Sequence, residues 1–299
     1  MFPVKHRKKF YIFSGITLLA SYLLIAVWGF NIGTDFRGGA IAEVYYKGDV
    51  PNQAEVERVV GEMGIGNVSV RSSGQNGFIV RTKELSAEEQ EGLRQVLSFG
   101  GTKEYNLERL NSVGPAIGKE LTDKALIAIA VVIAITVLYI AYTFRQISRP
   151  VSSWSYGLVA ILALIHDITI PAGFAVVLGR YSGMEVDALF ISALLSLLGY
   201  SINDTIIIFD RIRTNLQENK EKNIHESFES TVGKSLSETY ARSINTSVTV
   251  FLVLLSLLVF GSASIKFFIL TLIIGTIAGA YSSIFLAAPL LVWINNRNK

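Results

Sequence analysis

Apolar residues in this chain gather in long runs instead of recurring at a helical or strand spacing. Six runs are about 20 residues long, the length that an α-helix needs to cross the hydrocarbon core of a bilayer. They cover residues 10–30, 126–144, 156–178, 189–209, 244–260 and 267–294. Of the 299 residues, 51% are hydrophobic and 17% are charged. Soluble domains carry roughly 25% charged residues. The pattern therefore predicts an α-helical integral membrane protein with six transmembrane helices.

The distribution of basic residues predicts the orientation of these helices, because Lys and Arg concentrate in short cytoplasmic segments. With the N-terminus inside, the two short outer loops hold only Arg180 and Lys266. The inner segments then hold Lys5, Arg7, Lys8, Lys9, Arg145, Arg149, Arg211, Arg213, Lys220, Lys222, Lys234, Arg242, Arg297 and Lys299. We expect an uncleaved first helix, both termini in the cytoplasm and residues 31–122 outside a cytoplasmic (inner) membrane.

Between the first two runs, the chain predicts a small α+β domain. Strand patterns occupy residues 40–46, 68–71, 78–82 and 102–107, and helical patterns occupy 53–63 and 86–97. Ser86 with Glu89 three residues later forms a capping-box pattern for the second of these helices. The order βαββαβ is the ferredoxin-like pattern. We therefore divide the chain into residues 1–30 (N-terminus and first helix), 31–122 (extracytoplasmic domain) and 123–299 (five-helix bundle).

An acidic residue, Asp204, lies inside the fourth apolar run. A charged side chain at the centre of a bilayer costs roughly 2.5–3.5 kcal/mol on insertion scales, so it is rarely retained without a partner or a function. Ser192, Ser196 and Tyr200 precede it at four-residue spacing, which places all four on one helix face, with Asn203 alongside. Such a polar stripe is expected to face protein or trapped water.

Two further sets of residues are candidates for chemistry with Asp204. The fifth run opens with Arg242, followed by a polar stripe of Asn245, Thr246 and Thr249. A long arginine side chain can extend from the interface toward the membrane interior. We therefore expect an Asp204–Arg242 ion pair that lowers the burial cost of both charges.

The third run supplies the other set, the adjacent residues His166 and Asp167 near its middle. Neighbouring residues point in different directions on a helix, so only one of the two need face the fourth helix.

These polar residues also have structural explanations. Asp204, His166 or Asp167 could act only as a buried hydrogen-bond partner. Charges at the inner interface are normal for membrane helices, and the anchor role would suffice for Asp210, Arg211 and Arg213. Gly275 and Gly279 in the sixth run form a GxxxG pattern, which most simply marks a helix-packing face.

Several activities lack the residues that they require. The chain has no GxxxxGK[ST] loop for ATP, no HExxH or GxSxG motif and no cysteine. Asp167 and Asp204 could form an intramembrane aspartyl protease pair, but no Gly-x-Gly-Asp sequence surrounds either one. A net charge of +3 is too small to indicate a nucleic-acid partner. We expect no enzyme activity, no cofactor and no metal site.

Four segments of the chain resemble the SecF branch of the SecD/SecF protein-export family. Residues 34–39, Thr-Asp-Phe-Arg-Gly-Gly, are similar to the family's Asp-Phe-x-Gly-Gly element, and residues 113–121 are similar to its Val-Gly-Pro element. Residues 201–213 resemble the fourth-helix signature and 236–249 the fifth, with Ala-Arg-Ser at 241–243 where the family usually has Ser-Arg-Thr. The two junction elements contribute Asp35, Phe36, Gly38, Gly39, Gly114, Pro115 and Gly118.

The resemblance implies a fold like one half of an RND-type transporter, paired with SecD in the membrane. It implies work with the SecYEG channel, and with YidC as a further candidate partner, during late export of an unfolded polypeptide. In that family the fourth-helix acid and fifth-helix arginine are linked to proton flow. These positions are Asp204 and Arg242 here, with Asn203, Asp167 and His166 as further candidates for the relay.

Two other classes of function remain open at this stage. An RND-like half could export small molecules or lipids, although such exporters usually carry two halves in one chain and much larger outer domains. The protein could also be a scaffold that stabilises its partners without transporting anything.

Overall fold

The computed structural model describes residues 2–143 and 151–297. In these ranges, six helical segments are long and apolar enough to cross a membrane, which confirms the number of predicted spans. They are α2 (Arg7–Trp28), α6 (Pro115–Thr143), α7 (Ser153–Ser182), α8 (Ala188–Glu221), α9 (Phe228–Phe260) and a last segment, Lys266–Arg297. This last segment comprises α10 (Lys266–Ser282), a π-helical turn (Ser283–Ala287) and α11 (Ala288–Arg297).

Three of the helices extend well beyond the apolar runs that predicted them, and one of these, α6, begins at Pro115, ahead of residue 126. Helix α8 continues past residue 209 to Glu221, and α9 begins at Phe228, ahead of residue 244. Polar contacts hold the extensions of α8 and α9 together: Arg211 pairs with Glu238 at 2.6 Å, and Asn215 donates a hydrogen bond to Ser235 at 2.9 Å. A hydropathy pattern does not reveal this hairpin, because its buried apolar residues, such as Ile212 and Val232, are separated by charged and polar residues.

Part of the sequence prediction lies outside the described residues. The end of the second run at Phe144, the inner basic residues Arg145 and Arg149, and Lys299 at the C-terminus belong to this part.

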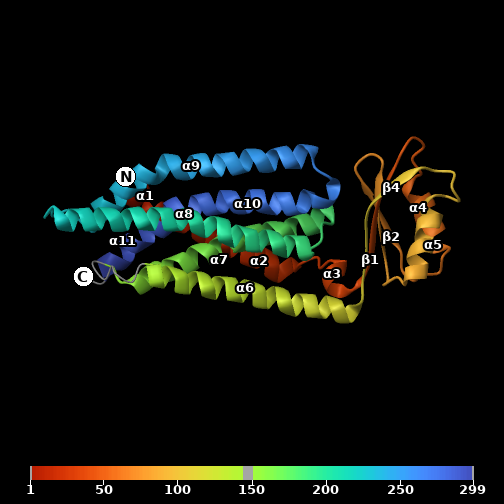
Figure 1. Cartoon of the computed structure of the whole chain (residues 1–299), viewed down its shortest axis with the longest axis horizontal. Coiled ribbons are helices and arrows are strands. Elements are labelled where there is room, and N and C mark those ends of the chain that lie inside the picture. The colour runs from red at the N-terminus through yellow and green to blue at the C-terminus, as the bar shows by residue number, and fades with distance from the viewer. Residues whose placement is uncertain (1, 144–150, 298–299) are drawn as a thin grey trace.

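Within the bundle, α10 occupies the centre and packs against α7, α8 and α9 (Figure 1). Its GxxxG glycines are packing positions, because a Cβ on Gly275 would lie 2.1 Å from the Leu197 side chain of α8. A Cβ on Gly279 would lie 3.1 Å from Ser201 of the same helix. By contrast, α6 lies at the side of the bundle and exposes large apolar residues such as Ile135 and Leu138. These exposed side chains are suited to lipid.

The segment between α2 and α6 folds into a sheet domain (residues 39–113). Its strands are β1 (Gly39–Tyr46), β2 (Ser69–Ser73), β3 (Gly77–Thr82) and β4 (Tyr105–Val113), and its helices are α4 (Gln53–Gly61) and α5 (Ala87–Leu97). All neighbouring strands are antiparallel, in the order β2-β3-β1-β4. The predicted capping box at Ser86 and Glu89 starts α5, and a second one at Asn52 and Glu55 starts α4.

Strand β4 was predicted at residues 102–107, and this range is wrong because the strand continues to Val113. A β-bulge opposite Glu43 and Val44 interrupts the alternation of buried and exposed positions. As a result, Leu107 and Leu110 both pack against the core although they are three residues apart. The broken alternation hid the second half of the strand from a period-two pattern.

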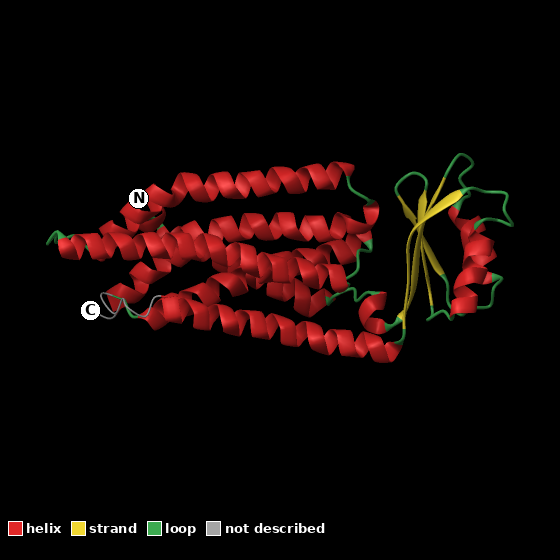
Figure 2. Cartoon of the chain, in the orientation of Figure 1, coloured by secondary structure: helices red, strands yellow, loops and turns green. Residues whose placement is uncertain are grey.

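The sheet domain stands at one end of the helical bundle, which we call the sheet end (Figure 1). Helix α1 (Phe2–Lys5) and α11 lie at the opposite end, the terminal end. Helices α4 and α5 cover the face of the sheet that points away from the bundle (Figure 2). The other face therefore points toward the bundle, where a short helix, α3 (Thr34–Arg37), connects the two parts.

Candidate functional site

Asp204 lies at the middle of α8, faces α9 and is only 1% exposed. Its Oδ2 accepts a hydrogen bond from Ser247 Oγ of α9 at 3.5 Å. Tyr200, one turn earlier on α8, donates to the same Ser247 hydroxyl at 3.3 Å. The polar stripe therefore brings Tyr200 and Asp204 together at one hydroxyl group of the neighbouring helix.

The expected ion pair between Asp204 and Arg242 does not form in this arrangement. None of the ion pairs within 4.0 Å among the described residues links the two side chains. Ser243 and Ser247 lie on the buried face of α9. Arg242, the residue before Ser243, lies outside this face and is exposed. Arg242 instead lines a pocket of about 370 Å³ between α8 and α9, together with Asp210.

The rest of the two predicted stripes does not face the interior of this chain. Ser192, Ser196, Asn203, Asn245 and Thr249 are all exposed. The hydroxyls among them donate to carbonyl groups of their own helix, for example Ser196 Oγ to Ser192 O at 2.8 Å. A helical hydroxyl can bond to its own backbone, so a polar stripe does not by itself require a buried face.

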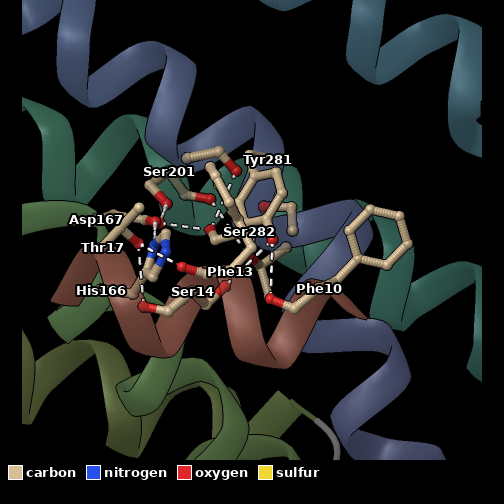
Figure 3. A network of polar contacts seen from close by, with 12 residues as sticks. Phe10, Phe13, Ser14, Thr17, His166, Asp167, Ser201, Tyr281 and Ser282 are labelled. Carbon is tan, nitrogen blue, oxygen red and sulfur yellow. Dashed lines mark hydrogen bonds and ion pairs between the residues drawn. The ribbon is translucent and has the colours of Figure 1, made fainter. Parts of the chain in front are cut away.

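A second intramembrane acid, Asp167 of α7, is also 1% exposed and has more hydrogen-bond partners than Asp204 (Figure 3). Its Oδ2 accepts hydrogen bonds from the hydroxyls of Ser201 on α8 and Ser282 on α10. The Ser282 contact is 2.8 Å long. Asp167 thus joins three of the transmembrane helices.

His166, the neighbour of Asp167 on α7, extends this group toward α2. Its Nδ1 lies 2.9 Å from Asp167 Oδ1, and its ring stacks on Tyr281 with centroids 5.9 Å apart. Tyr281 in turn donates to the Phe10 carbonyl oxygen at 3.0 Å and accepts from Ser14 Oγ at 3.3 Å (Figure 3). The polar network therefore reaches from α2 to α8 through the middle of the bundle.

Sequence reasoning missed the hydroxyl residues that surround the two acids. Ser201 and Ser282 hydrogen-bond to Asp167, and Thr205 forms a 2.9 Å hydrogen bond with Ser283 at the start of the π-helical turn. The only sequence signal was the occurrence of adjacent serines in an otherwise apolar helix. Single-turn π-helices occur frequently at functional sites, and this one begins beside Ser282, a hydrogen-bond donor to Asp167.

The charged motif in the half of α8 nearer the terminal end forms ion pairs. Arg213 pairs with Asp210 at 3.5 Å on one helix, and Arg211 pairs with Glu238 across to α9. The Asp210 side chain is 58% exposed. The Arg211–Glu238 pair joins the two helices of the hairpin, and Asp210, Arg211 and Glu238 line the pocket between α8 and α9.

At the sheet end, the two predicted junction elements lie against each other. A Cβ on Gly118 would lie 2.7 Å from the Phe36 carbonyl oxygen, and one on Gly38 would lie 3.0 Å from Pro115. Gly38 and Gly39 have φ values of +82° and +125°, a region that favours glycine. The glycines therefore allow α3 and α6 to approach closely where the sheet domain joins the bundle.

Asp35 is the buried anchor of this junction. It accepts a hydrogen bond from Ala188 N, the first residue of α8, at 3.1 Å. Arg109 of β4 lies 3.6 Å from Asp35 and 3.5 Å from Asp187, the residue that caps the N-terminus of α8. The junction thus contacts the start of the helix that carries Asp204.

Three arginines on the bundle-facing side of the sheet contact the α7–α8 loop (residues 183–187), and we call them the arginine clamp. Arg71 of β2 donates to the Gly183 carbonyl oxygen at 3.2 Å, and Arg81 of β3 pairs with Glu185 at 2.9 Å. Arg109 of β4 is the third member. Every strand except β1 contributes one arginine.

Backbone contacts and burial reinforce the clamp. Val186 forms a parallel bridge with Ile32, with N–H···O distances of 2.7 and 2.8 Å. Burial raises the pKa of the Glu185 carboxyl, and the nearby Arg81 charge partly opposes this effect. Burial likewise raises the pKa of Asp187, opposed by a backbone hydrogen bond and by Arg109. The loop held by the arginine clamp therefore contains two acids, Glu185 and Asp187, that take up protons more readily than exposed acids do.

The described residues contain no group of three or more His, Asp or Glu side chains placed to hold a metal ion. Two buried acids inside a six-helix bundle, with a clamped soluble domain, define a multi-pass membrane protein with polar groups at membrane depth. This is the class of protein in which intramembrane acids are commonly functional.

Comparison with known proteins gives the particular family. Residues 95–297 match the family model described as protein export membrane protein SecD/SecF, C-terminal. The chain is 37% identical to the protein translocase subunit SecF of Thermobaculum terrenum, over 99% of this chain and 94% of that one. It is 33% identical to the subunit of the same name from Synechocystis sp., over 97% and 92%. The chain therefore belongs to the SecD/SecF protein-export family, and within it to the SecF subunits.

Solved structures agree. The crystal structure of SecDF from Thermus thermophilus, described as a translocon-associated membrane protein, superimposes with a TM-score of 0.78 at 30% identity. The match covers 98% of this chain and 38% of that one. SecDF in a super-membrane-facing form matches with a TM-score of 0.64 at 29% identity, over 39% of its length.

Proposed function

We propose that this chain is an accessory subunit of the Sec protein translocase that uses the proton motive force to assist late export of unfolded polypeptides. The names of its relatives support a transport role instead of catalysis. The SecDF structures, in which this chain matches little more than a third of the length, support a SecD-like partner in the membrane. The SecYEG channel and YidC are further partners in this proposal.

The single observation that carries the proposal is the environment of Asp204. Its carboxyl group is buried at the midpoint of α8 and contacts a hydroxyl group instead of a cation. A hydroxyl can donate a hydrogen bond to a charged carboxylate or accept one from a protonated carboxyl. Asp204 can therefore gain and lose a proton without leaving a buried polar atom unpaired.

Arg242 supplies the positive charge that responds to the protonation state of Asp204. In the described arrangement it lines the pocket between α8 and α9, as expected when Asp204 is protonated and needs no cation. Loss of the proton leaves a buried negative charge, which attracts the arginine inward and draws the two helices together. One charge that crosses 100 mV releases about 2.3 kcal/mol, enough to bias two conformations by roughly fifty-fold.

The pocket also offers a path for the proton at the terminal end. Ile207, one turn below Asp204, lines it, as do Asp210 and Glu238. On the opposite side of α8, the hydroxyl network of Ser201 leads toward Asp167 and His166. We assign these two residues to the relay as a second proton-binding group, placed one helical turn closer to the sheet end.

Helix α8 connects this chemistry to the sheet domain. Its N-terminus is held by Asp35 and Arg109, and its middle carries Asp204. A shift of α8 on protonation would therefore pull directly on the arginine clamp, and the glycines of the junction would allow the sheet domain to rock. The unequal TM-scores to two SecDF forms at nearly equal identity support such mobility in the family.

The same proposal covers orientation and domain organisation. We keep the division into residues 1–30, 31–122 and 123–299, with the sheet domain outside the inner membrane and both termini in the cytoplasm. The strand order β2-β3-β1-β4, with all pairs antiparallel, supports a ferredoxin-like assignment. The six-helix bundle is assigned as one half of an RND-type arrangement, with SecD as the other half.

Exposed polar groups at membrane depth indicate where the partner packs. Asn203 of α8 and Asn245 of α9 are exposed in this chain, near the exposed hydroxyls of Ser196 and Thr249. Lipid cannot satisfy such groups, so a protein surface is the better neighbour. We place the SecD-like partner against the α8–α9 face, beside Arg242.

The test replaces Asp204 with Asn in the complex with its SecD-like partner, and Glu221→Gln serves as a matched control on the same helix. Asp204→Asn should assemble normally, because the amide can still pair with Ser247, yet abolish the stimulation of export by a proton gradient. Glu221→Gln should retain it, because this acid is exposed at the end of α8 and does not line the pocket. Both are measured as precursor translocation into vesicles with and without an imposed gradient. Gradient-dependent export that survives in Asp204→Asn would remove the mechanism and leave a scaffold.

A further inference from the structure

A pocket of about 350 Å³ opens at the sheet end, away from both acids of the bundle. Its lining residues come from the ends of α2 and α7, the segment that follows α2, and the sheet domain. Figure 1 shows where these elements meet. Its lining includes three arginines from three different elements: Arg37 of α3, Arg71 of β2 and Arg180 of α7. No acidic residue lines it. The pocket is therefore strongly positive.

Two of these arginines are available for a ligand. Among the described ion pairs, none involves Arg37 or Arg180, and both side chains are exposed. Arg71 uses one nitrogen for the Gly183 carbonyl group, which leaves most of its five N–H donors. The nearest acid of the α7–α8 loop, Glu185, is already paired with Arg81. The three arginine side chains thus line one pocket, and no acidic side chain lines it.

The position of the pocket indicates the kind of ligand. Trp28 at the end of α2 lines the pocket and contacts Tyr181, with ring centroids 5.9 Å apart in an edge-to-face arrangement. Both rings are exposed, at 43% and 76%. Exposed Trp and Tyr at the ends of spanning helices mark the level of the lipid headgroups. The arginines therefore lie at headgroup depth, with the apolar ends of α2 and α7 directly beside them.

We propose that this pocket binds the phosphate group of an anionic phospholipid, held by Arg37, Arg71 and Arg180. Arginine presents parallel N–H donors that match the oxygen atoms of a phosphate group. An anionic headgroup such as phosphatidylglycerol neutralises the pocket, while its acyl chains lie along the exposed apolar surface of α2. A bound lipid would thereby contact both a strand of the sheet domain and two helices of the bundle.

Free inorganic phosphate shares this chemistry, and the location favours the lipid as its source. Three positive side chains near one another repel without a ligand, so occupancy also stabilises the clamped position of Arg71 beside the loop. The assignment is independent of proton coupling, because neither Asp204 nor Arg242 takes part in it.

Trp28 reports on the site directly. The full chain, with Trp154→Phe and Trp293→Phe, is reconstituted into phosphatidylcholine vesicles that contain brominated phosphatidylglycerol or, at the same mole fraction, brominated phosphatidylcholine. Bromine quenches tryptophan fluorescence on contact. Each basic residue near a membrane surface contributes about 1 kcal/mol to anion binding, so quenching should show about fivefold or greater enrichment of phosphatidylglycerol.

The double variant Arg37→Gln/Arg180→Gln should lower this enrichment to near unity. Lys266→Gln, the other basic residue of the short loops at this end, is the matched control and should leave it unchanged. Millimolar inorganic phosphate that shifts Trp28 emission and removes the enrichment would identify free phosphate as the ligand. Equal quenching by both lipids in the parent chain, with no phosphate effect, overturns the proposal, as does enrichment that persists in the double variant.

Discussion

The aspartates inside the transmembrane bundle and the aspartates beside the arginine clamp have opposite polar surroundings. Asp167 and Asp204 contact hydroxyl groups and a histidine ring, whereas Asp35 and Asp187 face the guanidinium group of Arg109. A hydroxyl is donor and acceptor, but a guanidinium group only donates. The hydroxyl surroundings can therefore pair with both protonation states of a carboxyl group, whereas the guanidinium group can pair only with an acceptor oxygen. This difference separates a group that can switch from one that holds parts together.

The largest expected effect tests the bundle side of the comparison. Asp167→Leu removes the acceptor of Ser201 and Ser282 and should destabilise the protein by about 3 kcal/mol, since each stranded buried donor costs about 1–3 kcal/mol. Asp167→Asn keeps an acceptor oxygen and should retain most of the stability while losing proton exchange. Thermal unfolding of the purified complex in detergent distinguishes the two. Equal stability of both variants would show that the hydroxyl network is not a structural unit.

On the clamp side, Arg109→Gln leaves the carboxylates of Asp35 and Asp187 without their cation. We expect a loss of about 2 kcal/mol in the docking of the sheet domain, less than for a fully buried pair because backbone N–H groups still solvate both acids. Faster proteolysis of the α7–α8 loop measures the loss. Arg94→Gln on α5, whose partner Glu91 lies 3.9 Å away at the surface, is the control and should not change the rate. An unaltered cleavage rate in Arg109→Gln would contradict the clamp.

A smaller effect concerns pH. Burial raises the pKa of Glu185 above its ordinary value of 4.5 and that of Asp187 above 3.8. The docked loop therefore binds protons more readily than an open one. Docking should strengthen as the pH falls toward the raised values and weaken as the pH rises through them.

Glu185→Gln should remove the Glu185 share of this dependence, visible as a flatter profile of loop proteolysis between neutral pH and about pH 4. Docking that weakens steadily on acidification in the parent chain would show that the arginine pairs, and not burial, control these two acids.

The smallest expected change in stability comes from an exposed ion pair outside both regions, and it serves as the reference for the other variants. Arg58 and Glu62 form an i,i+4 pair at 2.9 Å on α4, with side chains more than 60% exposed. Solvent screens such a pair, so Arg58→Gln should change stability by less than about 0.5 kcal/mol. A thermal shift as large as that of Arg109→Gln would mean that the readout reports net charge and not the clamp.

The sequence predicted the bundle better than it predicted the site, for physical reasons. Twenty-residue apolar runs determine where helices cross a membrane, and the junction glycines were recognisable from their resemblance to two elements of the family. The position of Arg242 could not be predicted, since the rotation of α9 depends on which of its faces packs against α8. A difference of one residue changes the direction of a side chain by about 100°.

The clamp was hidden for another reason. Arg71, Arg81 and Arg109 are far apart in the chain and each lies on a strand with buried neighbours, so only the assembled sheet brings them to one face. Their partners lie in a loop more than 70 residues further along the chain. Likewise, Ser201 and Ser282 looked like isolated hydroxyls until α7, α8 and α10 came together around Asp167.

The length of α8 has a mechanical consequence. The helix runs from Ala188 to Glu221 without a break, and Asp204 is halfway along it, about 25 Å from either end. If the rod tilts about its centre, each 5° of tilt carries both tips through about 2 Å in opposite directions while the carboxyl group hardly moves. Asp204 would then lie at the pivot and keep its contacts, while one tip of α8 moves against the sheet domain and the other moves with the α8–α9 hairpin.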